Sequence, residues 1–134
     1  MSRNNPLELV RAFVDRINQH DVAGLCNLMS DDHVFVDSLG TRISSREEMR
    51  KAWIAYFFLV PDFHISITET MVQGNTVGMF GSAHGTCSVE GELHEQNRCE
   101  MPASWKAIVS GDKVSYWQVY ADNEPVRQIM ASQK

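Results

Sequence analysis

The sequence is poor in cysteine and in basic residues, and it has no long apolar run. Its three cysteines, none in a CxxC spacing, predict neither a disulfide framework nor a cysteine zinc site. Twelve basic against 17 acidic residues give a net charge of -5, which opposes binding to nucleic acid or to anionic membranes. The longest apolar stretch, residues 53–60, falls far short of the roughly 20 residues of a membrane-spanning helix. We therefore expect reduced thiols in a cytoplasmic protein, with neither nucleic-acid nor membrane partners.

Signatures of cofactor and metal sites are also missing. No glycine-rich phosphate loop follows a strand and opens a helix, and no Gly-x-Ser-x-Gly turn occurs. The acidic residues around His94, in segment 90–95, are more typical of a solvated face than of a metal site. The first residues are polar and give no sign of an export signal. The sequence therefore predicts no metal and no organic cofactor.

The composition, 43% hydrophobic in 134 residues, predicts one domain spanning 1–134 with a core of its own. Apolar residues at helical spacing, each run preceded by a capping residue, predict three helices in the first half of the chain. These helices are expected over 6–19 with Asn5 as cap, over 22–29 with Asp21 as cap, and over 46–60 with Ser45 as cap. A short strand over 33–37 separates the second helix from the third.

From Phe63 onward the apolar period changes from helical to alternating, which predicts four longer strands. They are expected from Phe63 to the turn at Gly74, and then over 76–87, 98–109 and 113–121. Segment 90–95 is predicted to be a looser connection, and Pro102 indicates a bulge or a sheet edge because it lacks an N–H donor. A last helix is expected from Pro125 to Met130.

This order of elements predicts an α+β fold, in which helices pack beside an antiparallel sheet. A sheet of this kind twists, and a bulge near Pro102 would help it to curl around the third helix into a cone. The open end of the cone is where we expect a ligand cavity.

Several segments, in this sequence order, resemble the nuclear transport factor 2-like (cystatin-like) superfamily and, within it, the SnoaL-like group. That group includes polyketide cyclases and ketosteroid isomerase-like proteins. The resemblance covers nearly the whole chain and implies the same cone-shaped fold. It is carried by Gln19-His20-Asp21-Val22, by the segment from Asp31 to Asp37, by Ala83-His84-Gly85-Thr86, by the segment from Ser110 to Val114, and by the segment from Trp117 to Asp122.

Asp37 is the most informative candidate for catalysis, because an apolar strand delivers its carboxylate. The resemblance places it at the general-base position of the isomerase-like members. Burial beside Phe13, Phe35 and Trp117 would penalise its charged form, so that it could transfer protons near neutral pH. The alternative is structural: Asp37 also begins an Asp-Ser-Leu-Gly turn, where aspartate commonly bonds the local backbone.

Two further residues are candidates for catalysis, and each has a structural alternative. Asp122 matches an acidic position that polyketide-cyclase-like members use as a catalytic acid, but it can equally support the terminal helix. His84 lies in a recurring family string, and it is either a proton shuttle, an orienting group or a polar strand residue. In the isomerases, a tyrosine and a protonated aspartate hold the substrate oxyanion. The resemblance places their counterparts here near Phe13 and Ser104, and neither of these residues can do this in the same way. Steroid isomerisation is therefore not expected.

Aromatic and aliphatic side chains that recur at helical or strand spacing more often form the core than contact a ligand. Some of them must nevertheless line any cavity in the cone. The residues expected to contact a ligand are Phe13, Ile17, Trp53, Tyr56, Phe57, Trp105, Trp117 and Tyr120.

The first functional hypothesis is an apolar cavity for a small cyclic or carbonyl-bearing molecule, with cofactor-independent isomerase, cyclase or hydrolase chemistry. The competing hypothesis is a binding or dimerising module without chemistry. In either case the resemblance implies a homodimer formed through the outer face of the sheet.

Overall fold

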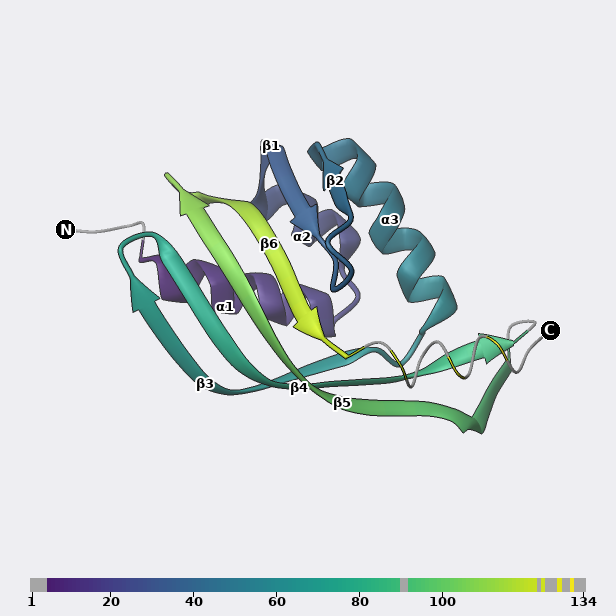
Figure 1. Cartoon of the computed structure of the whole chain (residues 1–134). Coiled ribbons are helices and arrows are strands. Elements are labelled where there is room, and N and C mark those ends of the chain that lie inside the picture. Colours follow the sequence, from purple (N-terminus) through teal and green to yellow (C-terminus); the bar gives the residue numbers. More distant parts are fainter. Residues whose placement is uncertain (1–4, 90–91, 123, 125–127, 129–130, 132–134) are drawn as a thin grey trace.

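The computed structural model describes residues 5–89, 92–122, 124, 128 and 131 of the chain. One curved, unclosed sheet of six strands carries the helices on its hollow side (Figure 1). The helices are α1 (Pro6–Asn18), α2 (Val22–Leu28) and α3 (Arg46–Leu59). The strands are β1 (Met29–Val36), β2 (Arg42–Ser44), β3 (His64–Gln73), β4 (Thr76–Val89), β5 (Glu92–Ser110) and β6 (Lys113–Ala121). The predicted α+β architecture is confirmed.

The three predicted helices form where their caps indicate. The Asn5 side chain accepts hydrogen bonds from the backbone N–H groups of residues 7 and 8. Asp21 accepts one from Gly24 at 2.9 Å, and Ser45 accepts one from Glu48 at 3.2 Å. Each cap satisfies N–H groups that the first helical turn leaves without partners.

The sheet differs from the prediction at its first two strands. Its order is β2-β1-β6-β5-β4-β3, and β1 pairs with β6 in parallel, whereas the other neighbours are antiparallel. Strand β1 begins at Met29 rather than at residue 33, so residue 29 belongs to the strand and not to the helix before it. Strand β2 was not predicted at all. It is short, and Ile43 lies opposite Phe35 in the hairpin that it forms with β1.

The last two connections also differ from expectation. Strand β5 already begins at Glu92, so most of the segment predicted as a loose connection is strand. Its Pro102 pairs with Ser82 of β4. Pairing of β5 with β6 starts only at the next residue, Ala103, so Pro102 has no strand neighbour on that side. Pro102 therefore lies at an edge of the sheet, as predicted, but the predicted bulge is absent there. The predicted terminal helix lies mostly outside the described residues.

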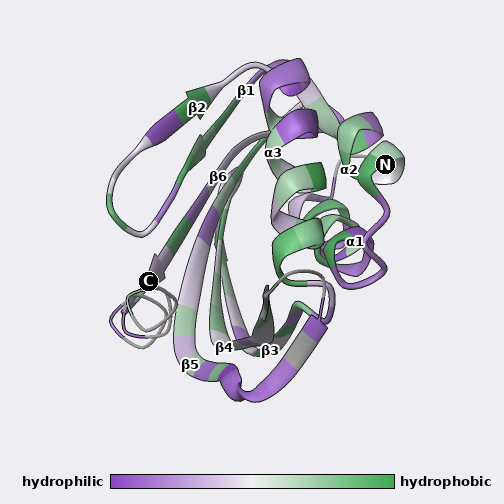
Figure 2. Cartoon of the chain, turned by 90° about the vertical axis from the view of Figure 1, so that its right-hand side faces the viewer, coloured by the Kyte–Doolittle hydropathy of each residue, from purple (hydrophilic) through white to green (hydrophobic). Residues whose placement is uncertain are grey.

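Breaks in register curve the sheet, and three of the four lie in the meander of β3 to β6. These three fall between Ile67 and Glu69 in β3, between Thr86 and Ser88 in β4, and between Ile108 and Val109 in β5. Such irregularities bend a strand and increase its twist. Because these three lie in the long meander, this part of the sheet wraps around the apolar faces of α1 and α3 (Figure 2).

The core fills the space between the sheet and α1. Phe13 and Ile17 of α1 are fully buried, and the Phe13 ring lies 4.8 Å from that of Trp117 on β6. His33 is also fully buried, and its Nδ1 bonds the carbonyl of Val114 at 2.8 Å. Burial lowers the pKa of His33, and this hydrogen bond opposes the shift only in part. The histidine is therefore a neutral core residue. No helix within the described ranges is long and apolar enough to cross a membrane.

The connection from α3 to β3 is tied to α1 on one side. The Asn18 side chain at the end of α1 donates to the carbonyl of Ile65 at 2.9 Å and accepts from its N–H at 2.8 Å. The Nε2 of His20 donates to the carbonyl of Phe63 at 2.8 Å, and its ring stacks on Phe57 of α3. These bonds fix the first residues of β3 against the end of α1.

The same connection is tied to β4 on the other side. Beyond His84, which pairs with the first residue of β3, β4 has no strand neighbour on the β3 side. There the Asp62 carboxylate accepts hydrogen bonds from both the N–H and the hydroxyl of Thr86, at 2.7 and 2.8 Å. Burial raises the pKa of Asp62, but the hydrogen bonds from Thr86 outweigh it and leave the pKa below its ordinary value. Val60 lies over Gly85, where an added Cβ would be 2.4 Å from Val60 Cγ1.

The backbone of β3 passes close to one glycine of β4 next to the bulge, and we expect this glycine to be required for stability. An added Cβ at Gly81 would lie 1.8 Å from the carbonyl oxygen of Ser66, a backbone atom that cannot move away cheaply, whereas at Gly78 the nearest atom is 3.9 Å away. We expect Gly81→Ala to lower the free energy of unfolding by about 2–3 kcal/mol and Gly78→Ala to change it by less than about 0.5 kcal/mol. Urea unfolding of both variants measures the difference, and equal stabilities would contradict this account of the bulge.

Candidate functional site: an apolar cavity between α3 and the sheet

A cavity of about 930 Å³ lies between α3 and the hollow face of the sheet. Its walls are largely apolar and aromatic, and they come from α3, from the loop after β1, and from β4, β5 and β6. The lining residues are Phe35, Asp37, Ser38, Met49, Ala52, Trp53, Tyr56, Leu59, Val60, Phe63, Ile65, Ala83, His84, Gly85, Cys87, Cys99, Met101, Ala103, Trp105, Trp117, Val119, Ala121, Glu124, Gln128 and Ala131.

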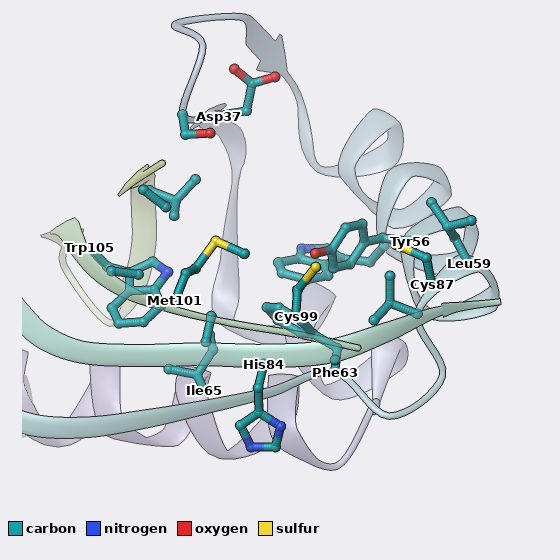
Figure 3. Close-up of a pocket in the computed structure, with 18 of the residues that line it drawn as sticks. Asp37, Tyr56, Leu59, Phe63, Ile65, His84, Cys87, Cys99, Met101 and Trp105 are labelled. Carbon is teal, nitrogen blue, oxygen red and sulfur yellow. The ribbon is translucent and has the colours of Figure 1, made fainter. Parts of the chain in front are cut away.

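Asp37 lies at the margin of this cavity, in the turn after β1 (Figure 3). Its Oδ1 accepts hydrogen bonds from the backbone N–H groups of Leu39 and Thr41, both at 2.9 Å. Its own N–H and carbonyl also bond within the turn, to Thr41 and Gly40. The carboxylate therefore organises the hairpin between β1 and β2, while Oδ2 has no hydrogen bond to a described residue.

His84 belongs to β4, but its imidazole points away from the cavity (Figure 3). Ala83, the residue before it, faces the cavity, and side chains alternate between the two faces of a strand. On the outer face, the ring of His84 lies 5.2 Å from that of His64 on β3, and the residue pairs with Glu100 of β5. The backbone of His84 contributes to the wall, whereas its ring nitrogens do not reach a ligand in the cavity.

Asp122 follows the end of β6 and is exposed. Its Oδ1 accepts a hydrogen bond from the N–H of Glu124 at 2.9 Å, and it does not line the cavity. The structure therefore does not bring Asp37, His84 and Asp122 together. Their side chains occupy the cavity margin, the outer face of the sheet and the solvent-exposed end of β6, respectively.

The predicted ligand-contacting residues divide into two groups. Trp53, Tyr56, Trp105 and Trp117 line the cavity. The other four do not: Phe13, Ile17 and Phe57 are buried behind the wall, and Tyr120 is 47% exposed on the outer face. Phe57 supports the wall directly, because its ring stacks on that of Trp53 at 5.1 Å.

The end of the cavity formed by Tyr56, Cys87 and Cys99 is electrically neutral. Tyr56 exposes 40% of its surface, but its hydroxyl lies at the inner end of the ring, on the side of Cys99 (Figure 3). Burial raises the pKa of this hydroxyl to about 12, and the nearby Cys87 and Cys99 add to the shift. Burial also raises the pKa of both thiols. At physiological pH all three groups are therefore protonated.

Several lining residues were missed by the sequence analysis. The alternation that places Trp105 in the wall also places Cys99, Met101 and Ala103 there, so the period of two in β5 was sufficient to find them. No local signal marks Glu124 or Gln128, which follow the last strand and join the wall through the tertiary fold. Among the described residues, no group of three or more histidine, cysteine or acidic side chains is placed to hold a metal.

Comparison with known proteins places the chain among relatives of the same shape. A family model described as the SnoaL-like domain matches residues 10–122. No curated protein matches the sequence.

Solved structures of the same shape share little sequence with the chain. A candidate SnoaL-like polyketide cyclase from Shewanella denitrificans OS-217 aligns with a TM-score of 0.82 at 18% identity, over 98% of this chain and 100% of the other. IdmH, a candidate polyketide cyclase from Streptomyces antibioticus, aligns with a TM-score of 0.77 at 18% identity, over 95% and 99% of the two chains. A protein from Catenulispora acidiphila with a ketosteroid isomerase-like fold, solved in complex with trimethylamine, aligns with a TM-score of 0.74 at 19% identity, over 89% of this chain and 88% of the other. At these identities the structural likeness establishes the fold and not the activity.

Proposed function

Because the chain belongs to the SnoaL-like family, we propose that it binds a small, largely apolar ring compound in the cavity between α3 and the sheet. The observation that supports this proposal is the cavity itself: about 930 Å³ of space with apolar and aromatic walls. A protein interior is normally close-packed, and a large concave space with apolar walls is typical of a small-molecule site.

The lining also indicates the charge of the ligand. Deep inside, the Tyr56 hydroxyl and the two thiols are neutral, and a charged group placed among them would lose its hydration without gaining a counter-ion. Asp37 and Glu124, the acidic residues of the described lining, would repel an anion. A neutral molecule fits these walls best.

Ligand binding can be tested with N-phenyl-1-naphthylamine, a neutral fluorophore that brightens in apolar sites. We expect saturable binding of one molecule per chain and a higher melting temperature at excess ligand, because a ligand that binds only the folded state stabilises it. Ala83→Trp places a large side chain in the cavity, and we expect it to weaken binding about tenfold.

The matched control is Ser82→Trp, which adds the same side chain to the outer face of β4, one residue away. Its affinity should equal that of the unmodified chain within about twofold. Equal affinities in the two variants would place the fluorophore outside the cavity and contradict the proposal.

A second candidate function is acid–base catalysis by Asp37, and its position at the cavity margin favours it. The turn holds Oδ1 with two backbone N–H groups, which fixes the carboxylate and leaves Oδ2 able to take a proton from a ligand. The cavity supplies the apolar surroundings, and no cofactor is needed for proton transfer between a carboxylate and a carbon or oxygen acid. Isomerisation, cyclisation and hydrolysis all contain such a step.

Asp37→Asn separates this catalytic role from the structural one. The amide oxygen can still accept from Leu39 and Thr41, so we expect unchanged stability, whereas loss of the base should slow turnover of a bound compound at least about 100-fold. Conversion is followed by mass spectrometry, with Asp32→Asn, an exposed position on β1, as the control. Turnover within about twofold of the unmodified chain would exclude Asp37 as the base.

We also propose that the chain forms a homodimer through the outer face of the sheet, as the family resemblance implies. Phe80 and Tyr120 flank Ser104 in one row across β4, β5 and β6, on the face opposite to the core residue Trp105. They are 40% and 47% exposed, so two large aromatic side chains lie uncovered on either side of β5 on this face. The free thiols of Cys26, Cys87 and Cys99 support placing the protein in the reducing cytoplasm.

Analytical ultracentrifugation tests the dimer. We expect twice the chain mass at micromolar concentration, and we expect Phe80→Glu to weaken association more than tenfold, because it places a charge in the buried interface. Phe58→Glu is the control, since Phe58 is 77% exposed on α3, far from this face. A monomer mass that does not change with concentration would rule out the dimer.

A further inference from the structure

Two histidines lie opposite each other on the outer face of the sheet, on the side away from the cavity. His64 is the first residue of β3, and it pairs directly with His84 of β4. Their imidazole rings lie 5.2 Å apart, centroid to centroid, and are tilted by 36°. Figure 3 shows that the His84 ring points away from the cavity. Neither ring therefore takes part in the cavity site.

The other three histidines of the chain are not arranged in this way. The Nε2 of His20 bonds a backbone carbonyl, and His33 is fully buried in the core. His94 is exposed on β5, and no ring contact joins it to another described histidine. By contrast, neither His64 nor His84 has a hydrogen bond or an ion pair to a described residue. The pair therefore has imidazole nitrogens that are open to an external partner.

The position of the two rings suits a metal ion. His64 is exposed and His84 is half-buried. The Nδ1 of His84 is buried without a hydrogen-bond partner, so Nε2 is the nitrogen of this ring that an ion can reach. Two imidazoles that bind one ion at about 2.0–2.1 Å, at the tetrahedral angle, hold their ring centroids about 5 Å apart. The observed separation of 5.2 Å therefore needs little change for both rings to share one ion.

The charge beside the pair favours a cation over an anion. Glu100 of β5 is exposed and lies opposite His84, so its carboxylate belongs to the same face of the sheet. Arg98, the preceding residue of β5 on this face, acts on the Asp62 carboxylate, which offsets its positive charge. A divalent cation held by the two imidazoles gains from the negative charge of Glu100, whereas an anion there would be repelled by it.

We propose that His64 and His84 chelate a divalent transition-metal ion that prefers imidazole ligands, such as Ni²⁺, Cu²⁺ or Zn²⁺, on the outer face of the sheet. No third histidine, cysteine or acidic side chain among the described residues completes the site, so water takes the remaining positions on the ion. The ion joins β3 to β4 where β3 begins. The sequence analysis missed the pair because its two ligands come from neighbouring strands and not from one spaced motif.

Isothermal titration calorimetry with Ni²⁺ alone tests the pair, because Ni²⁺ binds imidazole and does not oxidise the free thiols of the chain. We expect one Ni²⁺ per chain with a Kd on the order of 10 µM, since two imidazoles supply about half of the ligands of a structural metal site. Mg²⁺ prefers oxygen ligands, and we expect it not to bind at the same concentrations.

Substitutions of the two ligands test chelation. We expect His64→Ala and His84→Ala each to weaken Ni²⁺ binding at least about tenfold, because a single imidazole cannot chelate. The double variant should bind no more than about threefold more weakly than either single variant, since each ligand contributes only together with the other. His94→Ala is the matched control, because it removes an exposed histidine from β5 and should leave the affinity unchanged within about twofold.

Melting curves without metal verify that each variant is folded, and glutamine replaces alanine at either position if it is not. Tenfold weaker binding in both single variants, with the His94 variant unchanged, supports the inference. An unchanged affinity in either single variant, or no Ni²⁺ binding up to about 1 mM, overturns it. These outcomes are independent of the proposed cavity function, because the sheet separates the pair from the cavity and Ni²⁺ is the only probe.

Discussion

The cavity depends on how the connection between α3 and β3 is held. Asn18 binds both backbone groups of Ile65, His20 binds the carbonyl of Phe63, and Asp62 binds Thr86 on β4. These bonds hold the connection against α1 and β4, so they set where the chain leaves α3 relative to the sheet. Val60 then closes the space over Gly85. The polar contacts at the edge of the cavity pair backbone groups that have no strand neighbour or helix partner there.

The sequence was sufficient to predict the elements that its local chemistry determines. Capping residues and apolar spacing located the helices, and alternation located the four strands of the meander. It was not sufficient for the parallel pairing of β1 with β6, because residues at opposite ends of the chain decide that contact. The short strand β2 was missed for a related reason: three residues carry too little pattern, and pairing with Phe35 and its neighbours creates the strand. The positions of the bulges were also unpredictable, since Pro102 is accommodated at an edge and the curvature arises where no proline stands.

The sequence indicated which elements carry the candidate residues, but not the direction in which their side chains point. Asp37 and His84 both lie in the cavity wall, as expected from their place in the sequence. The period of two sends the His84 ring to the outer face, because its neighbour Ala83 already faces inward. The local turn engages the Asp37 carboxylate, which is the structural role that its Asp-Ser-Leu-Gly context indicated. A residue's place in a family pattern therefore says which element carries it, but strand alternation and local hydrogen bonds decide where its polar atoms point.

The polar lining of the cavity has a neutral end around Tyr56 and acidic residues, Asp37 and Glu124, elsewhere, and this has a physical consequence for the ligand. The Tyr56 hydroxyl stays protonated at physiological pH, so it is a donor without a formal charge. Donors of this kind favour an oxygen that is already partly negative, and they favour it more as charge develops on it, because the apolar walls lower the local dielectric. A carbonyl held there would be polarised without a metal or a charged side chain beside it. If a base removes a proton next to such a carbonyl, a hydrogen bond from this hydroxyl would stabilise the resulting oxyanion. The proposals of binding and of acid–base catalysis are therefore compatible, and the position of a base relative to the carbonyl would decide between them.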